Sequence, residues 1–192
     1  MNFTQDAWQD LVDGRRDYCG AISSCPLLFP GSFNPVHHGH RQMANLAGEL
    51  LGRRIHLEIS LVNVDKPPLD FAAIGQRLVQ AQRLGPVVLT RTPRFVDKAK
   101  VFPDATFIIG ADTAIRLDDP CYYDDDPKSR DRAIEQIADS GGRFLVFGRL
   151  VNHQFRDADA LDLSPTLRTI CQFVPKTQFR VDISSSQLRC ED

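Results

Sequence analysis

The chain has 192 residues, of which 42% are apolar and 25% are charged, as expected for a soluble globular protein with one domain. A chain of this length buries enough surface on folding to need neither disulfides nor a structural metal. The formal net charge of −2 argues against bulk electrostatic binding to nucleic acid or to an anionic membrane. A local basic pocket remains compatible with this charge.

The cysteines and the N-terminus indicate a cytoplasmic protein. The five cysteines are odd in number and are never spaced as Cys-x-x-Cys, so we interpret them as reduced thiols. The first ten residues are acidic and lack the apolar core of a signal peptide. No apolar stretch approaches the length of a membrane span.

The N-terminal residues are predicted to form an arm outside the main domain. The spacing of Trp8, Leu11 and Val12 places them on one face of a short helix within residues 4–18. We therefore divide the chain into an arm, residues 1–25, and a main domain, residues 26–192.

Strand-like and helix-like segments alternate through the main domain. Short apolar runs predict strands at residues 26–30, 55–64, 86–90, 106–110, 143–147 and 178–181. Apolar spacing predicts helices at residues 40–51, 71–84, 111–117, 132–138 and 164–171. This alternation predicts an α/β fold, Rossmann-like and doubly wound, with a mainly parallel sheet of five or six strands and helices on both faces. Ligands bind such sheets beyond the carboxyl ends of the strands.

The strongest motif, Gly-Ser-Phe-Asn-Pro-Val-His-His-Gly-His at residues 31–40, leads from the first predicted strand into a helix. Gly31 permits close backbone approach to a ligand, and free N–H groups at a helix start favour a phosphate. His37 and His40 can point into one pocket and donate hydrogen bonds to a phosphate. A turn with surface histidines is one alternative. A zinc site that includes His38 is another, disfavoured because no carboxylate or thiol joins the histidines.

Two further motifs follow predicted strands. Ile-Ser-Ser-Ser-Gln-Leu-Arg, residues 183–189, offers hydroxyls and backbone N–H groups to a phosphate, with Arg189 one turn further on. By itself this segment is equally well explained as a capped helix. In Gly-Ala-Asp-Thr, residues 110–113, Asp112 either caps a helix or accepts hydrogen bonds from a ribose or acceptor group, and capping is the better interpretation of this motif alone.

Together these motifs resemble those of a known superfamily. The histidine motif resembles the (H/T)xGH signature of the adenylyl- and cytidylyltransferases, and residues 183–189 resemble the ISSTxxR signature of the adenylyltransferase branch. Residues 110–113 resemble the GAD segment of the nicotinate and nicotinamide mononucleotide adenylyltransferases. The resemblance extends from Pro26 to Arg189, with the motifs in the family order.

The resemblance implies ATP and a phosphorylated small molecule as substrates, and direct in-line transfer without a covalent intermediate. It implies that Mg²⁺ accompanies ATP, and no protein ligand for the metal is assigned. The catalytic residues would be His37 and His40. The expected ATP-binding residues are Gly31, Ser32, Phe33, His37, Gly39, His40, Gly110, Asp112, Ile183, Ser184, Ser185, Ser186 and Arg189.

Two cations are candidates for phosphate or acceptor binding. Lys66 follows the second predicted strand, although an ordinary loop lysine explains it equally well. Arg149 follows the fifth predicted strand and resembles a family arginine there.

Several functions remain open at this point. The favoured acceptor is nicotinamide or nicotinate mononucleotide, and the rivals are phosphopantetheine adenylyltransferase, cytidylyltransferase and a non-catalytic nucleotide-binding module. Residues 183–189 disfavour cytidylyl transfer, and the intact His37 and His40 disfavour a pure binder. No nucleic-acid or membrane partner is expected, and self-association is left open.

The acceptor ring needs a flat wall, and the only tryptophan, Trp8, lies outside the motifs. We expect Tyr122, Tyr123 or Phe102 to supply that wall. If the acidic loop at residues 118–126 also lines the site, it would repel a carboxylate-bearing ring, and nicotinamide mononucleotide would be preferred. The carboxylates at residues 124–126 are interpreted as a solvated loop rather than a metal site.

Overall fold

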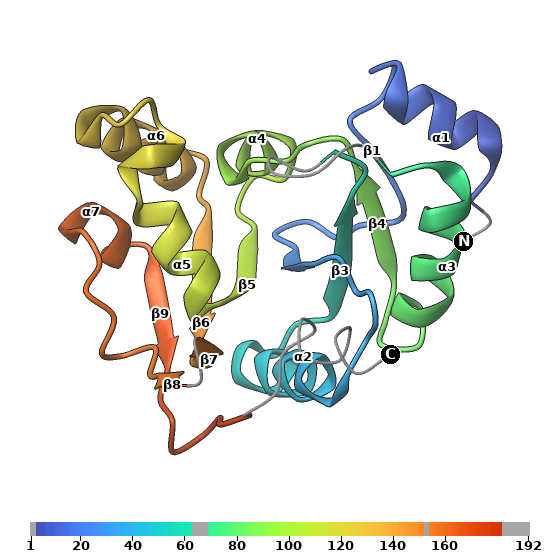
Figure 1. Cartoon of the computed structure of the whole chain (residues 1–192). Helices are drawn as coiled ribbons and strands as arrows, with labels where there is room; N and C mark the ends of the chain where they lie inside the picture. Colours follow the sequence, from blue (N-terminus) through green and yellow to red (C-terminus); the bar gives the residue numbers. More distant parts are fainter. Residues whose placement is uncertain (1–2, 63–68, 152–153, 182–192) are drawn as a thin grey trace.

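The computed structural model describes residues 3–62, 69–151 and 154–181. Its centre is a seven-stranded sheet with the order β1-β4-β3-β2-β5-β6-β9, which confirms the predicted α/β class and extends the predicted five or six strands. Only the edge strand β1 is antiparallel to its neighbour (Figure 1). The strands are β1 Tyr18–Cys19, β2 Leu27–Pro30, β3 Ile55–Ser60, β4 Val87–Thr90, β5 Thr106–Gly110, β6 Arg143–Phe147 and β9 Cys171–Val174.

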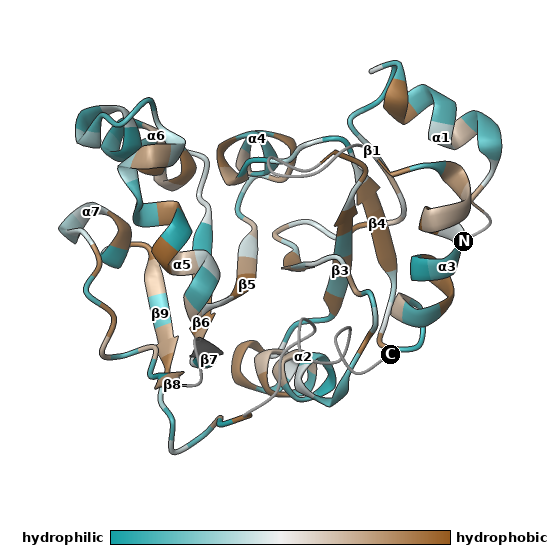
Figure 2. Cartoon of the chain, viewed as in Figure 1, coloured by the Kyte–Doolittle hydropathy of each residue, from teal (hydrophilic) through white to brown (hydrophobic). Residues whose placement is uncertain are grey.

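Helices cover both faces because successive side chains of each buried strand point to opposite sides. Leu27 and Phe29 of β2 pack in one core with residues of α2 and α3, whereas Leu28 packs in a second core with residues of α4, α5, α6 and α7. In Figure 2, β4 is apolar along its length while α6 is largely hydrophilic. The helices are α1 Gln5–Val12, α2 His38–Leu51, α3 Phe71–Ala81, α4 Phe95–Val101, α5 Ala111–Asp118, the 3₁₀ helix η1 Pro120–Tyr122, α6 Pro127–Asp139 and α7 Pro165–Arg168.

The strand order reverses between β2 and β5. From β2 the chain builds outward through β3 and β4, and from β5 it builds in the other direction through β6 and β9. The loops that follow β2 and β5 therefore diverge, and open α/β sheets bind ligands in the crevice at such a reversal point. The histidine motif follows β2 and the Gly-Ala-Asp-Thr motif follows β5.

The N-terminal arm packs on the rest of the fold. Thr4 caps α1 by accepting a hydrogen bond from the Ala7 amide, and Leu11 is fully buried. The Trp8 indole N–H donates to the Leu69 carbonyl at 3.4 Å. Val12 is 44% exposed, so the expected three-residue apolar face is only partly buried. Beyond α1, β1 pairs with β4 and closes that edge of the sheet.

α4 was not predicted, and a buried ion pair anchors it. Lys98 is 3% exposed, and its ammonium donates to Glu58 of β3 at 2.6 Å and to the Thr92 carbonyl at 2.7 Å. The Thr90 hydroxyl also donates to the Glu58 carboxylate. Burying this lysine is tolerable because its charge is paired and its hydrogen bonds are made inside the protein.

The predicted strand at residues 178–181 is wrong, and the predicted helix at residues 164–171 ends at Arg168. The last strand of the sheet is instead β9, at residues 171–174, and residues 179–181 have no regular structure. The apolar alternation of Phe179 and Val181 mimics a strand, but the Phe179 ring packs edge-on against Phe147 at 4.9 Å between centroids. The structure also adds a small hairpin after β6, β7 Arg149–Val151 with β8 Gln154–Arg156.

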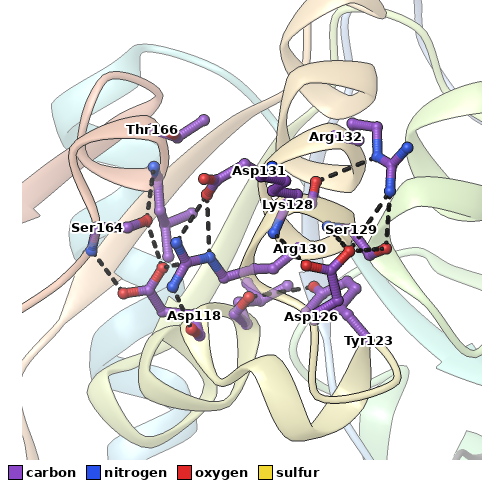
Figure 3. A network of polar contacts seen from close by, with 12 residues as sticks. Asp118, Tyr123, Asp126, Lys128, Ser129, Arg130, Asp131, Arg132, Ser164 and Thr166 are labelled. Carbon is purple, nitrogen blue, oxygen red and sulfur yellow. Dashed lines mark hydrogen bonds and ion pairs between the residues drawn. The ribbon is translucent and has the colours of Figure 1, made fainter.

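Within the acidic segment at residues 118–126, Asp124 and Asp125 lie in an exposed turn, as expected for a solvated loop, whereas the other aspartates support helices. Asp119 accepts from the Cys121 amide and caps η1, and Asp126 accepts from the first amides of α6. Asp118 accepts from the amide and hydroxyl of Ser164, and the Arg130 guanidinium lies 3.7 Å from the same carboxylate (Figure 3). These contacts join α5, α6 and α7. None of the helices in the described part of the chain has the length and apolarity of a membrane span.

Candidate active site

The histidine motif forms the turn between β2 and α2. His37 is the N-cap of α2 in an extended conformation, and α2 begins at His38. The imidazole rings of His37 and His40 stack with centroids 3.8 Å apart and planes 27° apart. The backbone N–H of His37 donates to Nδ1 of His40 at 3.2 Å. One histidine therefore fixes the orientation of the other.

Two phenylalanine rings pack against the His40 ring. Phe33 and Phe29 contact the His40 ring with centroid distances of 5.2 and 5.9 Å. Phe33 is fully buried and has a positive φ of 46°. A Cβ at Gly31 would lie 2.9 Å from the Phe33 ring, so this turn requires glycine. Phe33 was expected to bind ATP. Its ring is buried in the core, so only its backbone could contact a ligand.

Both histidines are uncharged at neutral pH. Burial, followed by the charges of Arg149 and His38, lowers the pKa of His37 from 6.5 to about 4. Burial, followed by the charges of His37 and Arg149, lowers the pKa of His40 to about 3. A neutral imidazole carries one N–H, and because Nδ1 of His40 accepts a hydrogen bond, its proton lies on Nε2. His40 thus has one N–H donor to offer.

An ion pair joins the start of β7, after β6, to the start of α5, after β5. Nη1 of Arg149, the first residue of β7, lies 3.1 Å from Oδ1 of Asp112 in the first turn of α5. Asp112 does not cap α5, because the N-cap is Gly110 and no side chain caps it. The capping interpretation is therefore wrong, and the carboxylate is committed to Arg149 instead. A Cβ at Gly110 would lie 2.7 Å from that same carboxylate oxygen.

The C-terminal part of the described chain returns to the histidine motif. A Cβ at Gly39 would lie 3.0 Å from the His37 ring and 3.3 Å from Val181. The chain therefore reaches the motif just before the segment predicted to hold ATP. Lys66, Ile183, Ser184, Ser185, Ser186 and Arg189 lie outside the described residues.

The structure gathers six of the expected residues around this crevice: His37, Gly39, His40, Gly110, Asp112 and Arg149. Ser32, in the same turn, is exposed, and its carbonyl accepts a hydrogen bond from Arg77 of α3 at 3.5 Å.

The expected aromatic wall is not at this crevice. Phe102 is buried and packs on Tyr18, and the Tyr123 hydroxyl donates to the Leu117 carbonyl at the C-terminal end of α5. Tyr122 and the acidic segment share that end, because η1 follows α5 directly. An eight-residue helix is about 12 Å long, so α5 separates them from Asp112. The acidic segment therefore lies at the opposite end of α5 from Asp112, so the condition under which nicotinamide mononucleotide would be preferred is not met.

Residues without a motif also lie here. Arg156 of β8 is opposite Arg149 in the hairpin register, and the Arg180 guanidinium lies 5.2 Å from the centroid of the Phe155 ring. From α3, Gln80 accepts a hydrogen bond from the Val36 amide. Arg156 lies in a hairpin that was not predicted, and the contacts of Arg180 and Gln80 join segments 25 and 44 residues apart, for which sequence spacing offers no signal. No group of three potential metal-binding side chains occurs among the residues that the structure describes.

Comparison with known proteins agrees with this geometry. The model of the cytidylyltransferase-like family matches residues 28–191. A protein of Gloeobacter violaceus, named probable nicotinate-nucleotide adenylyltransferase, is 29% identical over 182 aligned positions, which cover 84% of this chain and 81% of the relative. The family match includes the turn with His37 and His40 and the loops with Asp112 and Arg149. The chain therefore belongs to the cytidylyltransferase-like family and is a nucleotidylyltransferase-family enzyme with a nucleotide substrate.

Proposed function

We propose that this enzyme transfers the adenylyl group of ATP to a pyridine mononucleotide and releases pyrophosphate. The observation that carries the proposal is the stacked, uncharged pair His37 and His40 at the reversal point of the sheet, with Arg149 nearby. The adenylyltransferase-like segment at residues 183–189 and the name of the Gloeobacter relative support ATP and a pyridine acceptor.

The reaction needs positioning and charge stabilisation more than acid–base chemistry. A phosphate oxygen of the acceptor attacks the α-phosphorus of ATP, a new P–O bond forms, and the bond to the pyrophosphate leaving group breaks. Negative charge shifts onto the leaving pyrophosphate. Preorganised N–H donors from His37 and His40, with the fixed cation of Arg149, would stabilise that charge.

We propose that Mg²⁺ enters with ATP. Asp112, the described carboxylate in this crevice, is already paired with Arg149. ATP phosphates and water would therefore supply most of the ligands, as is usual for Mg²⁺. When bound, the ion would neutralise part of the phosphate charge, while the protein's own residues orient the nucleotide.

The arginines near the crevice favour nicotinate mononucleotide over the amide form. The electrostatic reason to prefer nicotinamide was repulsion by the acidic segment, which lies at the other end of α5. Arg149 and Arg156 are opposite one another in the hairpin, and Arg180 lies over Phe155. A carboxylate on the acceptor ring is attracted by such a group of cations.

The test is an acceptor panel. The full chain is incubated with ATP, Mg²⁺ and, separately, nicotinate mononucleotide, nicotinamide mononucleotide and phosphopantetheine, and pyrophosphate release is measured. We expect the highest kcat/KM with nicotinate mononucleotide. A preference for nicotinamide mononucleotide would overturn the electrostatic argument, and activity with phosphopantetheine alone would overturn the pyridine acceptor. CTP in place of ATP is the control for nucleotide choice.

A further inference from the structure

α3 holds the turn that carries the histidines. The Gln80 side chain accepts a hydrogen bond from the Val36 backbone N–H at 2.9 Å. Val36 directly precedes His37, the N-cap of α2. Gln80 is 44 residues further along the chain, so this contact joins α3 to the turn that leads into α2.

Gln80 and Val36 meet at the wall of a groove and not inside the core. The groove has a volume of about 500 Å³ and is lined by Val36, Arg41, Gln76, Val79, Gln80 and Arg83. A side chain of similar size at residue 80 therefore fits without crowding. Gln76 lies on the same helix and lines the same groove one turn earlier, and it is exposed.

We propose that Gln80 is a positioning residue of the active site, whose amide oxygen fixes Val36 and thereby the His37 ring. The inference rests on the proposed role of His37. The Val36 amide is in a half-buried turn, where it needs an acceptor. If the acceptor is removed, the turn can shift to find water, and the histidine moves with it. A small displacement of a donor is costly in the transition state and less costly in the ground state.

The experiment compares three variants of the full chain. Gln80→Met keeps the size of the side chain and removes the acceptor, Gln80→Glu keeps an acceptor oxygen, and Gln76→Met makes the same change one turn away. We expect kcat to fall about tenfold in Gln80→Met with little change in the KM for ATP. Gln80→Glu should restore most of kcat, and Gln76→Met should match wild type. Equal kcat in Gln80→Met and Gln76→Met would overturn the proposal.

Two additional measurements separate this inference from the proposed function. His40→Ala serves as the activity reference: if it turns over at wild-type speed, the role of the histidines fails, whatever Gln80 does. The positioning itself is read by NMR without turnover. The Val36 amide and the His37 ring resonances should shift in Gln80→Met and stay in place in Gln76→Met. Unshifted resonances in Gln80→Met would overturn the positioning role even if every acceptor proved inactive.

Discussion

Arg149 and Asp112, 37 residues apart in the chain, meet as an ion pair with 3.1 Å between Nη1 and Oδ1. The pair connects the loop after β6 with the start of α5, so it fixes a cation beside two histidines whose pKa values it helps to lower. The pair is partly exposed, with about a third of each side chain accessible. It therefore contributes more to the position of Arg149 than to the stability of the fold.

Replacing Arg149 with Met should raise the pKa of both His37 and His40. Burial, the largest cause of the lowered pKa values, remains in the variant, so both should stay below 6.5. An NMR titration of the imidazole protons measures the change. Arg156→Met, on the opposite strand of the hairpin, is the control and should move them less. A pKa that falls or stays constant in Arg149→Met would show that the arginine does not act on the pair.

Replacing His40 with Ala should lower kcat by about 10²-fold or more, because it removes a preorganised donor. His40→Gln retains an oxygen that can accept from the His37 amide, so it separates the catalytic donor from the local hydrogen bond. Both variants should remain folded by circular dichroism and both should be slow. A folded His40→Ala enzyme with wild-type kcat would remove the histidine from the mechanism.

The stability of the protein without ligand should depend on pH through His40. Its folded-state pKa of about 3 is below the ordinary value of 6.5, so the unfolded state binds the proton first as pH falls. Stability from this group is complete above pH 6.5 and is lost progressively toward pH 3. Urea unfolding between pH 7 and 4 should therefore show a steeper loss for wild type than for His40→Gln. Parallel pH profiles would contradict the lowered pKa.

Replacing Gly75 with Ala should stabilise the protein by about 0.5–1 kcal/mol. Gly75 lies inside α3, and a Cβ there would meet no atom within 4 Å. Gly31→Ala is the opposing case, because its Cβ would meet the Phe33 ring at 2.9 Å. Thermal unfolding should show a higher Tm for Gly75→Ala and a lower Tm for Gly31→Ala. A lower Tm for Gly75→Ala would mean that α3 is constrained in a way its open surroundings do not indicate.

Replacing Arg189 with Ala should weaken ATP binding by roughly 1.5–3 kcal/mol, the usual loss for a charge-assisted contact. The reason is the adenylyltransferase-like sequence that this arginine ends. Isothermal titration with ATP and Mg²⁺ measures the loss. Unchanged affinity would leave residues 183–189 as a helix cap and nothing more.

The sequence was most informative where strands are buried on both sides. Residues 106–110 and 143–147 were predicted with the bounds of β5 and β6, because every residue from Phe107 to Gly110 and from Phe144 to Phe147 is buried. A continuous apolar run of this length does not fit the pattern of an amphipathic helix, so it indicates a buried strand. β9 was missed because it lies at the edge of the sheet, where only Val174 is fully buried. Long-range packing, not local pattern, selected residues 171–174 over 178–181.

Motifs indicated the candidate site, but they could not specify its contacts. His37 and His40 are three residues apart, and this spacing alone predicts that both rings can point into one pocket. Asp112 was interpreted as a helix cap because local capping is the usual role of such a residue, and the distant Arg149 overrode it. Gln80 belongs to no motif, because a glutamine on an amphipathic helix carries no functional signal in the sequence. Its role becomes visible only when the fold places Val36 beside it.

The position of Val181 beside Gly39 has a consequence for the order of events during synthesis. Strands β2 to β6 can pair as soon as residue 147 has left the ribosome, since each pairs with a strand already made. The wall that Val181 provides beside His37 arrives 34 residues after Phe147. At about 5–20 residues per second, the nascent chain spends seconds with β2 to β6 able to pair and without the segment that lies beside the histidine motif. Most of the sheet can therefore form before the candidate site is complete.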